Sequence, residues 1–423
     1  MDNRVLKKPE LLVPAGSLEV LKTAVMFGAD AVYIGGELFS LRAKAKNFGP
    51  EQMKEGIAFA HEHNAKVYVT ANVTAHNRDL GGVRKYFEEL KEIKPDGLII
   101  SDPGVFDIAR EVCPEIEVHI STQANNVNYG TYRFWHRLGA SRVVSGRELS
   151  LEEIRELRDN IPEELEIESF VHGAMCISYS GRCLLSAYMT GRDANLGACT
   201  HPCRWKYYLM EEKRPGEYFP VEENERGTYI FNSKDLCMIE YIPELVAAGI
   251  NSFKIEGRMK PALYVAVVAG VYREAIDDYF ADPELYQKKK AYYKECISKC
   301  SHRQFYTGFY FGRPETEGQL YDGNVYEREA VYLGIVETVD ANGYCAMEQK
   351  NKFAVGEKLE LLHPHAAVKC VTVVDMLDEE GNHIENCPHA KQRIRVLFSE
   401  TPETYDLLRR PETAETEDSL NIL

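Results

Sequence analysis

The chain opens with short apolar, β-branched segments that alternate with amphipathic ones at intervals of about 20 to 35 residues, which predicts repeated βα units. The predicted helices carry apolar residues at three- and four-residue spacing, as in Leu18 to Phe27, Gln52 to His63, Val83 to Ile93 and Leu151 to Asp159. Eight strands are predicted, at Leu11 to Pro14, Ala31 to Ile34, Lys66 to Asn72, Gly97 to Ser101, Val118 to Thr122, Arg142 to Ser145, Leu165 to Val171 and Ser252 to Glu256. An α/β protein of the TIM-type (β/α)8 barrel class is therefore expected. A doubly wound open sheet would give a similar pattern, and the count of eight favours closure.

The alternation breaks after the seventh predicted strand, where a segment rich in cysteine, glycine and arginine begins. We expect a cysteine-rich insertion at about residues 172–235 on a βα loop, over the catalytic face of such a barrel. Within it, Lys206 to Glu211 and Thr228 to Asn232 are predicted strands of a hairpin around Pro215-Gly216.

A different pattern follows the eighth unit. Helices are predicted at Pro261 to Phe280 and Tyr286 to Ser298, and apolar and polar residues alternate from near Ala330. This period of two predicts a small C-terminal antiparallel β-barrel with strands at Val331 to Val339, Tyr344 to Met347, Lys358 to Leu362, Val368 to Met376 and Arg393 to Leu397. The expected domains are a barrel at 1–280, a helical linker at 281–328, the β-barrel at 329–402 and a disordered acidic tail at 403–423.

The composition is that of a folded globular protein with an excess of acidic residues. Of 423 residues, 44% are hydrophobic and 27% charged, as in folded globular proteins. The formal net charge of −16 works against long-range attraction to nucleic acid, although a local basic rim could override it. Such a rim is predicted from Arg42, Lys44, Lys46, Lys254, Arg258 and Lys260. No apolar run approaches the roughly 20 residues of a membrane span, and the start lacks the apolar core of a secretory signal, so a cytoplasmic protein is expected.

Four cysteines give the best clue to function. Cys176, Cys183, Cys199 and Cys203 follow one another with six, fifteen and three residues between them. Thiolates grouped in this way suit either tetrahedral zinc or an iron-sulfur cluster, and the spacing is unlike the paired knuckles of zinc ribbons, which favours [4Fe-4S]. A disulfide framework is disfavoured by the odd total of eleven cysteines and by a reducing compartment. Cys237 is the reserve candidate for the fourth ligand.

Polar residues at the ends of the predicted strands indicate where a site would form, because these ends meet at one opening of a barrel. We expect Asn72, Asp102, Gln123, Arg147, His172 and the turn from Lys254 to Arg258 to face that opening. The candidate catalytic residues are Glu168, His172 and Glu256. Glu168 points into or out of the barrel according to a one-residue register, and His172 is either a core residue or a hydrogen-bond partner near the first cysteine.

Signatures of hydrolases are missing from the sequence. There is no His-Glu-x-x-His helix and no Gly-x-Ser-x-Gly turn, and the histidines of His61-Glu62-His63 face different sides of a helix. A cysteine protease could pair Cys176 with His172 or Cys203 with His201, but that leaves the other cysteines unexplained. The run Arg204-Trp205-Lys206-Tyr207-Tyr208 alternates cations and aromatics, as in segments that bind RNA or in a strand with buried aromatics.

Several motifs resemble those of the peptidase U32 family. The stretch Glu168-Ser169-Phe170-Val171-His172-Gly173-Ala174-Met175-Cys176 to Ser186 fits its signature, Glu-x-Phe-x-x-Gly-Ala-x-Cys, four residues, Ser-Gly-x-Cys-x-x-Ser. Pro14-Ala15-Gly16-Ser17, Gly28 to Gly35, Asn232 to Cys237 and Phe253 to Lys260 are also typical, and the β-rich tail resembles the family's C-terminal domain.

The resemblance implies one of several activities. The family is named for collagenase-like peptidases, whereas members of similar layout act in hydroxylation of RNA or of ubiquinone precursors. This length and tail are similar to the tRNA hydroxylation proteins, which form 5-hydroxyuridine at the wobble position and draw on prephenate and an iron-sulfur cluster. That likeness implies Cys176, Cys183, Cys199 and Cys203 as ligands.

Prephenate, as a possible co-substrate, needs cations for its carboxylates. Arginine binds a carboxylate through a bidentate fork, so Arg147, Arg258 and Arg42 are candidate binding residues, supported by Lys254, Gln123 and Asn72. Each arginine could instead form a structural ion pair. The expected function is iron-sulfur-dependent hydroxylation of a tRNA uridine, with tRNA and a protein partner or homologous subunit as partners. The alternatives are a collagenase-like peptidase and a non-catalytic scaffold of an RNA-modification complex.

Overall fold

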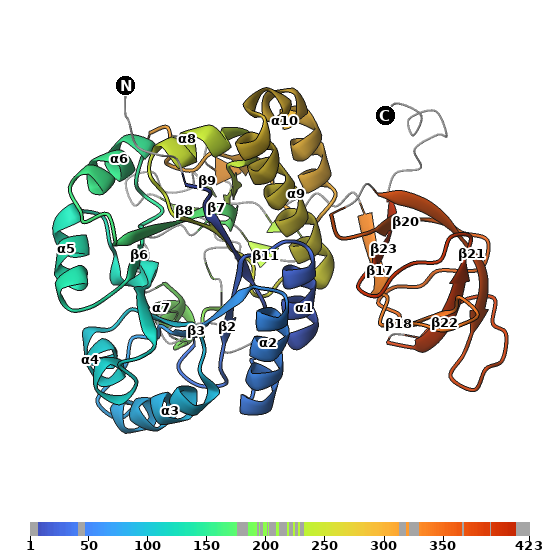
Figure 1. The fold of residues 1–423 in the computed structure, drawn as a ribbon, viewed down its shortest axis with the longest axis horizontal. Coiled ribbons are helices and arrows are strands. Elements are labelled where there is room, and N and C mark those ends of the chain that lie inside the picture. Colours follow the sequence, from blue (N-terminus) through green and yellow to red (C-terminus); the bar gives the residue numbers. More distant parts are fainter. Residues whose placement is uncertain are drawn as a thin grey trace.

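The computed structural model describes residues 7–40, 47–175, 185–192, 194, 198–200, 202, 209–210, 218–219, 223–224, 227–228, 232–312, 319–320, 330–365, 368–389 and 391–411. Its first part is a ring of parallel strands surrounded by helices (Figure 1). The strands are β1 (Glu10–Pro14), β2 (Ala31–Gly35), β3 (Lys66–Ala71), β4 (Gly97–Ile100), β5 (Glu117–Ile120), β6 (Arg142–Val144), β7 (Glu166–Ala174) and β14 (Ser252–Ile255). The ring closes because β14 pairs in parallel with both β1 and β7. The TIM-type barrel is confirmed, and each strand lies where the sequence placed it.

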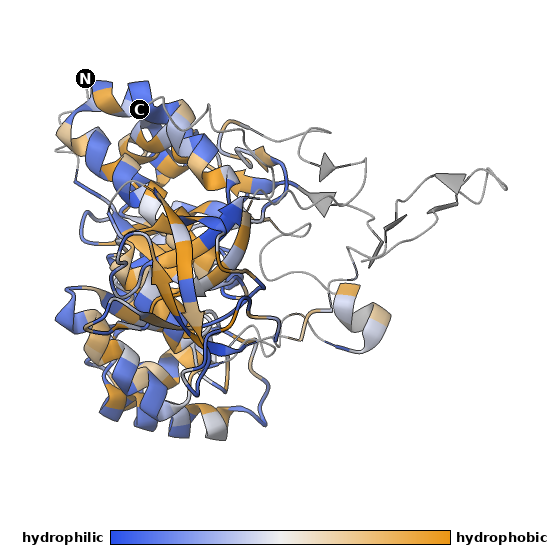
Figure 2. Ribbon diagram, turned by 90° about the vertical axis from the view of Figure 1, so that its right-hand side faces the viewer, coloured by the Kyte–Doolittle hydropathy of each residue, from blue (hydrophilic) through white to orange (hydrophobic). Residues whose placement is uncertain are grey.

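Helices cover the outside of the ring. They are α1 (Leu18–Met26), α2 (Pro50–Glu62), α3 (Leu80–Ile93), α4 (Pro103–Val112), α5 (Tyr129–Arg137), α6 (Leu151–Asp159), α8 (Ile242–Ala247) and α9 (Ala262–Ala281). In Figure 2, where the C-terminal sheet faces the viewer, the helices carry both hydrophobic and hydrophilic residues. Capping sets several helix starts: Ser150 and Glu153 form a reciprocal capping box on α6. Asp102, expected at the barrel opening, instead caps α4 by accepting from the backbone N–H groups of Gly104 and Val105.

The segment predicted as a linker is built into the barrel unit. Helix α10 (Pro283–Ser298) lies against α9, where the Tyr293 hydroxyl donates to Asp278 at 2.5 Å. Two short strands, β13 (Asp235–Cys237) and β15 (Phe305–Tyr306), extend the sheet beyond β7, with β13 antiparallel to β7 and parallel to β15. The described residues of 281–328 therefore do not form the predicted separate linker, because they pack on the barrel and extend its sheet.

Short ladders occur in the described parts of the insertion. The strand β8 (Leu209–Met210) pairs with β9 (Tyr218–Phe219), and β10 (Glu223–Asn224) pairs with β11 (Gly227–Thr228). The predicted hairpin around Pro215-Gly216 is confirmed in part, because β8 pairs with a strand on the far side of these residues in the sequence. The returning strand is Tyr218–Phe219, whereas Thr228, predicted to begin that strand, pairs with Glu223. The insertion also contains helix α7 (Leu185–Thr190). At its end, β12 (Asn232–Ser233) pairs with β16 (Gln319–Leu320). Two short 3-10 helices lie elsewhere in the barrel unit, η1 (Thr122–Ala124) after β5 and η4 (Ile239–Tyr241) after β13.

The C-terminal part is a separate antiparallel sheet in the order β17-β23-β20-β21-β22-β19-β18. Its strands are β17 (Ala330–Ile335), β18 (Thr338–Val339), β19 (Cys345–Glu348), β20 (Lys358–Leu362), β21 (Lys369–Leu377), β22 (Arg393–Phe398) and β23 (Leu407–Pro411). The sheet curls until β17 approaches β19, where the N–H of Lys350 donates to the carbonyl of Leu333 at 2.8 Å.

The expected disordered tail from residue 403 is wrong for residues 403–411. Strand β23 lies between β17 and β20, and Leu407 and Leu408 are fully buried. Residues 412–423 lie outside the described residues. The sheet contacts the barrel through Lys350, which pairs with Glu19 at 3.0 Å, and through Tyr405, whose ring lies 5.7 Å from that of Phe59. Among the described helices, none is both long enough and apolar enough to cross a membrane.

Candidate functional site

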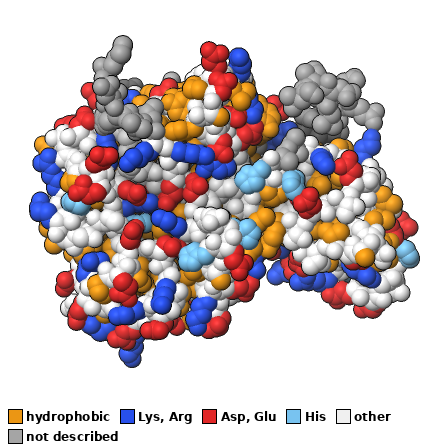
Figure 3. Space-filling view, in the orientation of Figure 1, with side chains coloured by type: hydrophobic (Ala, Val, Ile, Leu, Met, Phe, Trp, Pro, Cys, Tyr) orange, Lys and Arg blue, Asp and Glu red, His pale blue; other side chains and the backbone are white. Residues whose placement is uncertain are grey.

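A pocket opens at the carboxyl ends of the barrel strands, where the sequence predicted a site. Six of the predicted residues line it, namely Asn72, Gln123, Arg147, Lys254, Glu256 and Arg258. They come from four different strand ends or the loops behind them, so the barrel topology brings them together. On the face of the molecule seen in Figure 3, acidic and basic side chains are interspersed. The pocket lining includes three cations, Arg147, Lys254 and Arg258, and one carboxylate, Glu256.

Arg258 is held tightly at the wall of this pocket. It is 5% exposed, and its Nη1 donates to the hydroxyls of Ser40 at 2.6 Å and Thr70 at 2.9 Å. A Cβ at Gly35 would lie 2.2 Å from that nitrogen, so the absence of a side chain at this position makes room for the guanidinium. Sequence and packing therefore fix the place of this cation.

Arg147 is positioned differently. Its Nη1 donates to the carbonyl of Ala174 at 2.7 Å, and its guanidinium carbon lies 4.4 Å from the ring centroid of Phe170. Its Nε is buried and has no hydrogen-bond partner among the residues the structure describes, and no carboxylate of those residues lies within ion-pair distance. Arg147 as a whole is half-buried, and its Nε lacks a partner among the described residues, so its guanidinium is suited to bind an anion that enters the pocket.

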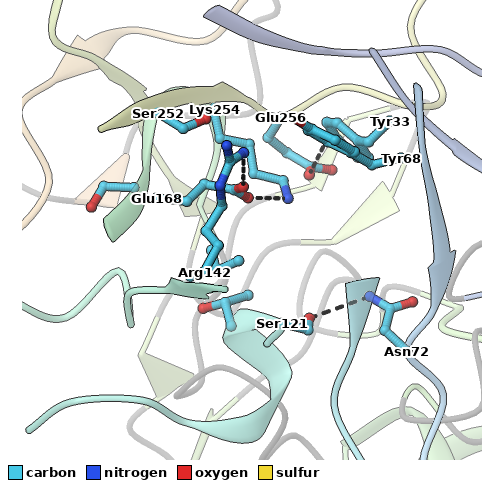
Figure 4. A network of polar contacts seen from close by, with 12 residues as sticks. Tyr33, Tyr68, Asn72, Ser121, Arg142, Glu168, Ser252, Lys254 and Glu256 are labelled. Atoms are coloured by element: carbon cyan, nitrogen blue, oxygen red, sulfur yellow. Dashed lines mark hydrogen bonds and ion pairs between the residues drawn. The ribbon is translucent and has the colours of Figure 1, made fainter. Parts of the chain in front are cut away.

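Lys254 ends a chain of buried charges that crosses the barrel interior (Figure 4). Its Nζ donates to Glu168 Oε1 at 2.5 Å, and Arg142 Nη1 donates to Glu168 Oε2 at 3.2 Å. Arg142 in turn pairs with Glu10 at 2.6 Å, and Glu10 accepts hydrogen bonds from Tyr68 and Ser252. The open question about the register of Glu168 is settled: its side chain points inward and lies directly beneath the pocket.

Burial and charge act in opposite directions on these carboxyl groups. Burial alone would raise the pKa of Glu168, but the charges of Lys254 and Arg142 outweigh it and lower that pKa. For Glu10, burial is likewise outweighed by Arg142 and by hydrogen bonds, and the pKa falls from 4.5 to about 2. A buried ion network seldom stabilises a fold more than apolar packing would. Its value here is that it fixes the ammonium of Lys254 at the pocket.

Glu256 and Tyr33 form the adjacent wall. The hydroxyl of Tyr33 donates to the carbonyl of Ile255 at 2.9 Å and lies 3.4 Å from Glu256 Oε2. The N–H of Glu256 donates to the carbonyl of His172, and Gly173 approaches it so closely that a Cβ there would lie 2.5 Å from the Glu256 carbonyl oxygen. With φ at +109°, Gly173 occupies a conformation that favours glycine.

His172 does not face the pocket with the other predicted residues. A register shift between β7 and β14 pairs Lys254 with Phe170 but Ile255 with His172, which breaks the alternation of inward and outward side chains. The ring of His172 therefore lies outside the barrel wall, 5.5 Å from that of Tyr272 and 5.6 Å from that of Phe305, counted between centroids. Burial lowers its pKa from 6.5 to about 3, so the ring is neutral.

Most of the predicted cysteine ligands lie outside the described residues, namely Cys176, Cys183 and Cys203, as does Arg42. Cys199 is described and half-buried beside Thr200, whose N–H donates to the hydroxyl of Ser186 at 3.0 Å. Cys237 is 8% exposed in the core, and burial raises the pKa of its thiol to about 12. No group of three metal-binding side chains occurs among the described residues alone.

The predicted basic rim is only partly visible in the described part of the chain. Lys254 and Arg258 lie inside the pocket, and Lys260 is half-buried with its Nζ donating to the carbonyl of Ser301. Lys44 and Lys46 lie outside the described residues.

Sequence reasoning missed several residues that line the pocket and one residue of the ion network beneath it. The missed pocket residues are Tyr33, Thr70, Ile99, Ser121, Thr122 and Phe170, and Arg142 was missed beneath it. Most of them are uncharged residues of strands, so nothing distinguished them from the core. Arg142 did carry a signal, since a charged residue opens a strand that is otherwise apolar.

Comparisons with known protein families and known proteins match both parts of the chain, the barrel and the C-terminal sheet. The pattern of peptidase family U32 matches residues 16–320, and that of the peptidase family U32 C-terminal domain matches residues 328–409. The chain is 40% identical over 407 residues to tRNA hydroxylation protein P1 of Bacillus subtilis (strain 168), with 96% of each chain covered. It is 37% identical over 450 residues to tRNA hydroxylation protein P of Escherichia coli (strain K12), covering 97% of this chain and 98% of the relative. It is also 30% identical over 413 residues to Collagenase of Porphyromonas gingivalis (strain ATCC BAA-308 / W83), covering 95% and 97%.

Proposed function

The chain belongs to peptidase family U32, and on that premise we propose that it acts as an enzyme in the hydroxylation of uridine in tRNA. Two relatives that match it over almost their whole length carry the name of tRNA hydroxylation proteins. The observation in the structure that carries the proposal is the pocket at the barrel mouth, lined by Arg147, Lys254 and Arg258. We infer that this pocket would bind an anionic co-substrate, close to where β7 leads into the cysteine segment.

The pocket chemistry supports a carboxylate co-substrate, and prephenate is the candidate. Arg147 has an unpartnered Nε among the described residues, and Arg258 is held rigidly by two hydroxyls, so both can bind carboxylate oxygens with little loss of side-chain freedom. The side-chain amides of Asn72 and Gln123 line the same pocket and would bind uncharged oxygen atoms. Glu256, in the adjacent wall, would accept a hydrogen bond from a hydroxyl group of the ligand.

For the cofactor, we propose a [4Fe-4S] cluster held by Cys176, Cys183, Cys199 and Cys203. Four thiols are a donor set suited to such a cluster, which when bound supplies single-electron transfer. Cys237 stays the reserve candidate for the fourth ligand; its side chain is 8% exposed and packs in the hydrophobic core of the barrel unit. The test measures iron and acid-labile sulfide in protein purified without oxygen. We expect about four of each per chain, lost in Cys199→Ala and in Cys203→Ala and kept in Cys237→Ala. Zinc in place of iron would contradict the proposal.

The alternative activity suggested by the relative named Collagenase has less support from the pocket. A peptidase needs an activated nucleophile or a metal-bound water. The described residues that line the pocket include neither histidine nor cysteine, and His172 is neutral and turned away from it. Release of peptides from gelatin by the purified chain, unaffected by loss of Cys199, would favour the peptidase.

The function itself is tested in cells that lack the chain. We expect hydroxylated uridine to disappear from their digested tRNA, measured by mass spectrometry of nucleosides, and to return with a plasmid-borne copy. Unchanged levels of hydroxylated uridine in cells without the chain, and without a second copy of this family, would overturn the proposal.

A further inference from the structure

Lys254 places a primary amine at the wall of the carboxylate pocket. Its side chain is 5% exposed, and its Nζ lies 4.5 Å from the ring centroid of Tyr33 and 5.4 Å from that of Phe170. Lysines that are desolvated, or that lie near other cations, are the ones enzymes use as nucleophiles toward carbonyl groups. Binding of a carboxylate alone would not require this amine to be enclosed by two rings.

The neighbouring arginine indicates which carbonyl compound would meet the amine. The guanidinium of Arg147 lies 4.4 Å from the centroid of the same Phe170 ring that lies near Lys254 Nζ. Both side chains also line the same pocket, so a ligand whose carboxylate is bound by Arg147 would share that pocket with the amine of Lys254. In a 2-oxo carboxylate the carbonyl carbon is directly attached to the carboxyl carbon, so it would lie within reach of the amine.

Glu168 supplies the acid-base partner that such a reaction needs. Its Oε1 accepts from Lys254 Nζ at 2.5 Å, while Arg142 holds the other carboxylate oxygen and with it the orientation of the group. Glu168 is fully buried and contacts the Lys254 ammonium directly, so its carboxylate is the group placed to take up the lysine proton as the amine attacks a carbonyl.

We propose that Lys254 forms an imine with a 2-oxo carboxylate bound at Arg147. The inference deepens the proposed function and rests on it in one respect, that the ligand is the carboxylate co-substrate of the same pocket. The imine would make the bound co-substrate electron-poor next to its carboxylate and would keep it in the pocket until the product leaves.

The step balances without any further reactant. The ammonium of Lys254 gives one proton to Glu168, and the free amine attacks the carbonyl carbon, forming a C–N bond as the C=O double bond opens. The oxygen takes a proton from the attacking nitrogen and then the proton held by Glu168, and it leaves as water. An ammonium and a ketone thus become an iminium and water, with no change in oxidation state.

The test traps the imine in the full-length wild-type chain, purified without oxygen. The protein is incubated with pyruvate and sodium cyanoborohydride, which reduces an iminium to a stable secondary amine, and is then digested with trypsin. Trypsin cuts after Lys234, Lys254 and Arg258, so an adduct on Lys254 blocks the middle cut and yields one peptide of residues 235–258. Methyl pyruvate, which lacks the carboxylate, and lactate, which lacks the carbonyl, are the matched ligand controls.

We expect an adduct on Lys254 with pyruvate, none with lactate, and a yield about tenfold lower with methyl pyruvate or in Arg147→Met at limiting ligand concentration. The adduct should be lost in Lys254→Arg and kept in Lys91→Arg, the same change at an exposed position. No adduct on wild-type Lys254 with saturating pyruvate, or equal labelling of exposed lysines, would overturn the inference. If tRNA hydroxylation fails while the adduct forms, the proposed function is wrong and the imine chemistry stands.

Discussion

Removal of Arg142 should destabilise the barrel through charge rather than through packing. Its side chain is 5% exposed and pairs with the carboxylates of Glu10, which is 16% exposed, and Glu168, which is fully buried. In Arg142→Met, Glu10 would lose its main cation, and Glu168 would keep only Lys254. Removing one partner of a buried ion pair costs about 3 to 5 kcal/mol, so we expect the free energy of unfolding of the barrel to fall by that amount near pH 7.

The pH dependence distinguishes this cause from a packing defect. The pKa of Glu10 falls from 4.5 to about 2 in the folded chain because Arg142 and hydrogen bonds outweigh its burial. A group whose pKa is lowered by folding stabilises the fold above its unfolded pKa, and this stabilisation is lost as the pH falls toward the folded pKa. The lowered pKa of Glu10 contributes about 3 kcal/mol to the free energy of unfolding at neutral pH. In Arg142→Met, burial would instead raise the pKa of Glu10, so the deficit in stability should shrink as the pH falls.

The assay is urea unfolding followed by circular dichroism at pH values between about 7 and 4. Arg155→Met is the matched control, because it makes the same chemical change at an exposed position on α6. We expect the unfolding midpoint of Arg142→Met to lie well below that of the control at pH 7 and to approach it on acidification. Equal midpoints at pH 7, or a difference that does not vary with pH, would refute this account of the network.

Three further predictions concern the pocket and its surroundings. Gly173→Ala should lower the melting temperature, because the φ of Gly173 is +109° and a Cβ there would lie 2.5 Å from the Glu256 carbonyl oxygen. Gly191→Ala, where a Cβ would meet nothing within 4 Å, should lower it less, and equal shifts in the two variants would contradict the clash. Arg147→Met should weaken binding of pyruvate, measured by titration calorimetry, by about tenfold or more, with partial recovery in Arg147→Lys, and an unchanged affinity would remove Arg147 from the site. Because the pKa of His172 is about 3, His172→Gln should leave the shape of the pH–rate profile between about pH 5.5 and 8 unchanged, and loss of a step in that range would show that the histidine titrates there.

The barrel could be predicted from sequence because its strands are buried on both faces. Such strands appear as continuous apolar runs, as at Leu11 to Pro14 and Ala31 to Ile34, and the amphipathic helices between them follow a different period. Strand β23 was missed because Leu407–Pro411 follows a polar stretch and precedes an acidic one. Its place between β17 and β20 depends on contacts with residues far away in the sequence, which local pattern does not contain.

The site was predictable to the extent that barrel topology alone places it. Charged or amide side chains just after apolar strands, such as Asn72, Arg147 and Arg258, converge once the ring is closed. His172 was misplaced because a register shift in β7 turns it outward, and a single extra residue in a strand leaves no trace in the hydrophobic pattern. The ion network behind Lys254 was missed for another reason: which charges pair inside a barrel depends on strand register, which the sequence does not specify.

The central claim is that the pocket at Arg147 serves tRNA hydroxylation, and one measurement tests it most directly. Cells lacking the chain receive copies of the wild type, Arg147→Met or Arg155→Met, expressed at equal levels, and the hydroxylated uridine of their tRNA is quantified by mass spectrometry. The account predicts full recovery with the wild type and with Arg155→Met and a severe loss with Arg147→Met. Full recovery with Arg147→Met would contradict it.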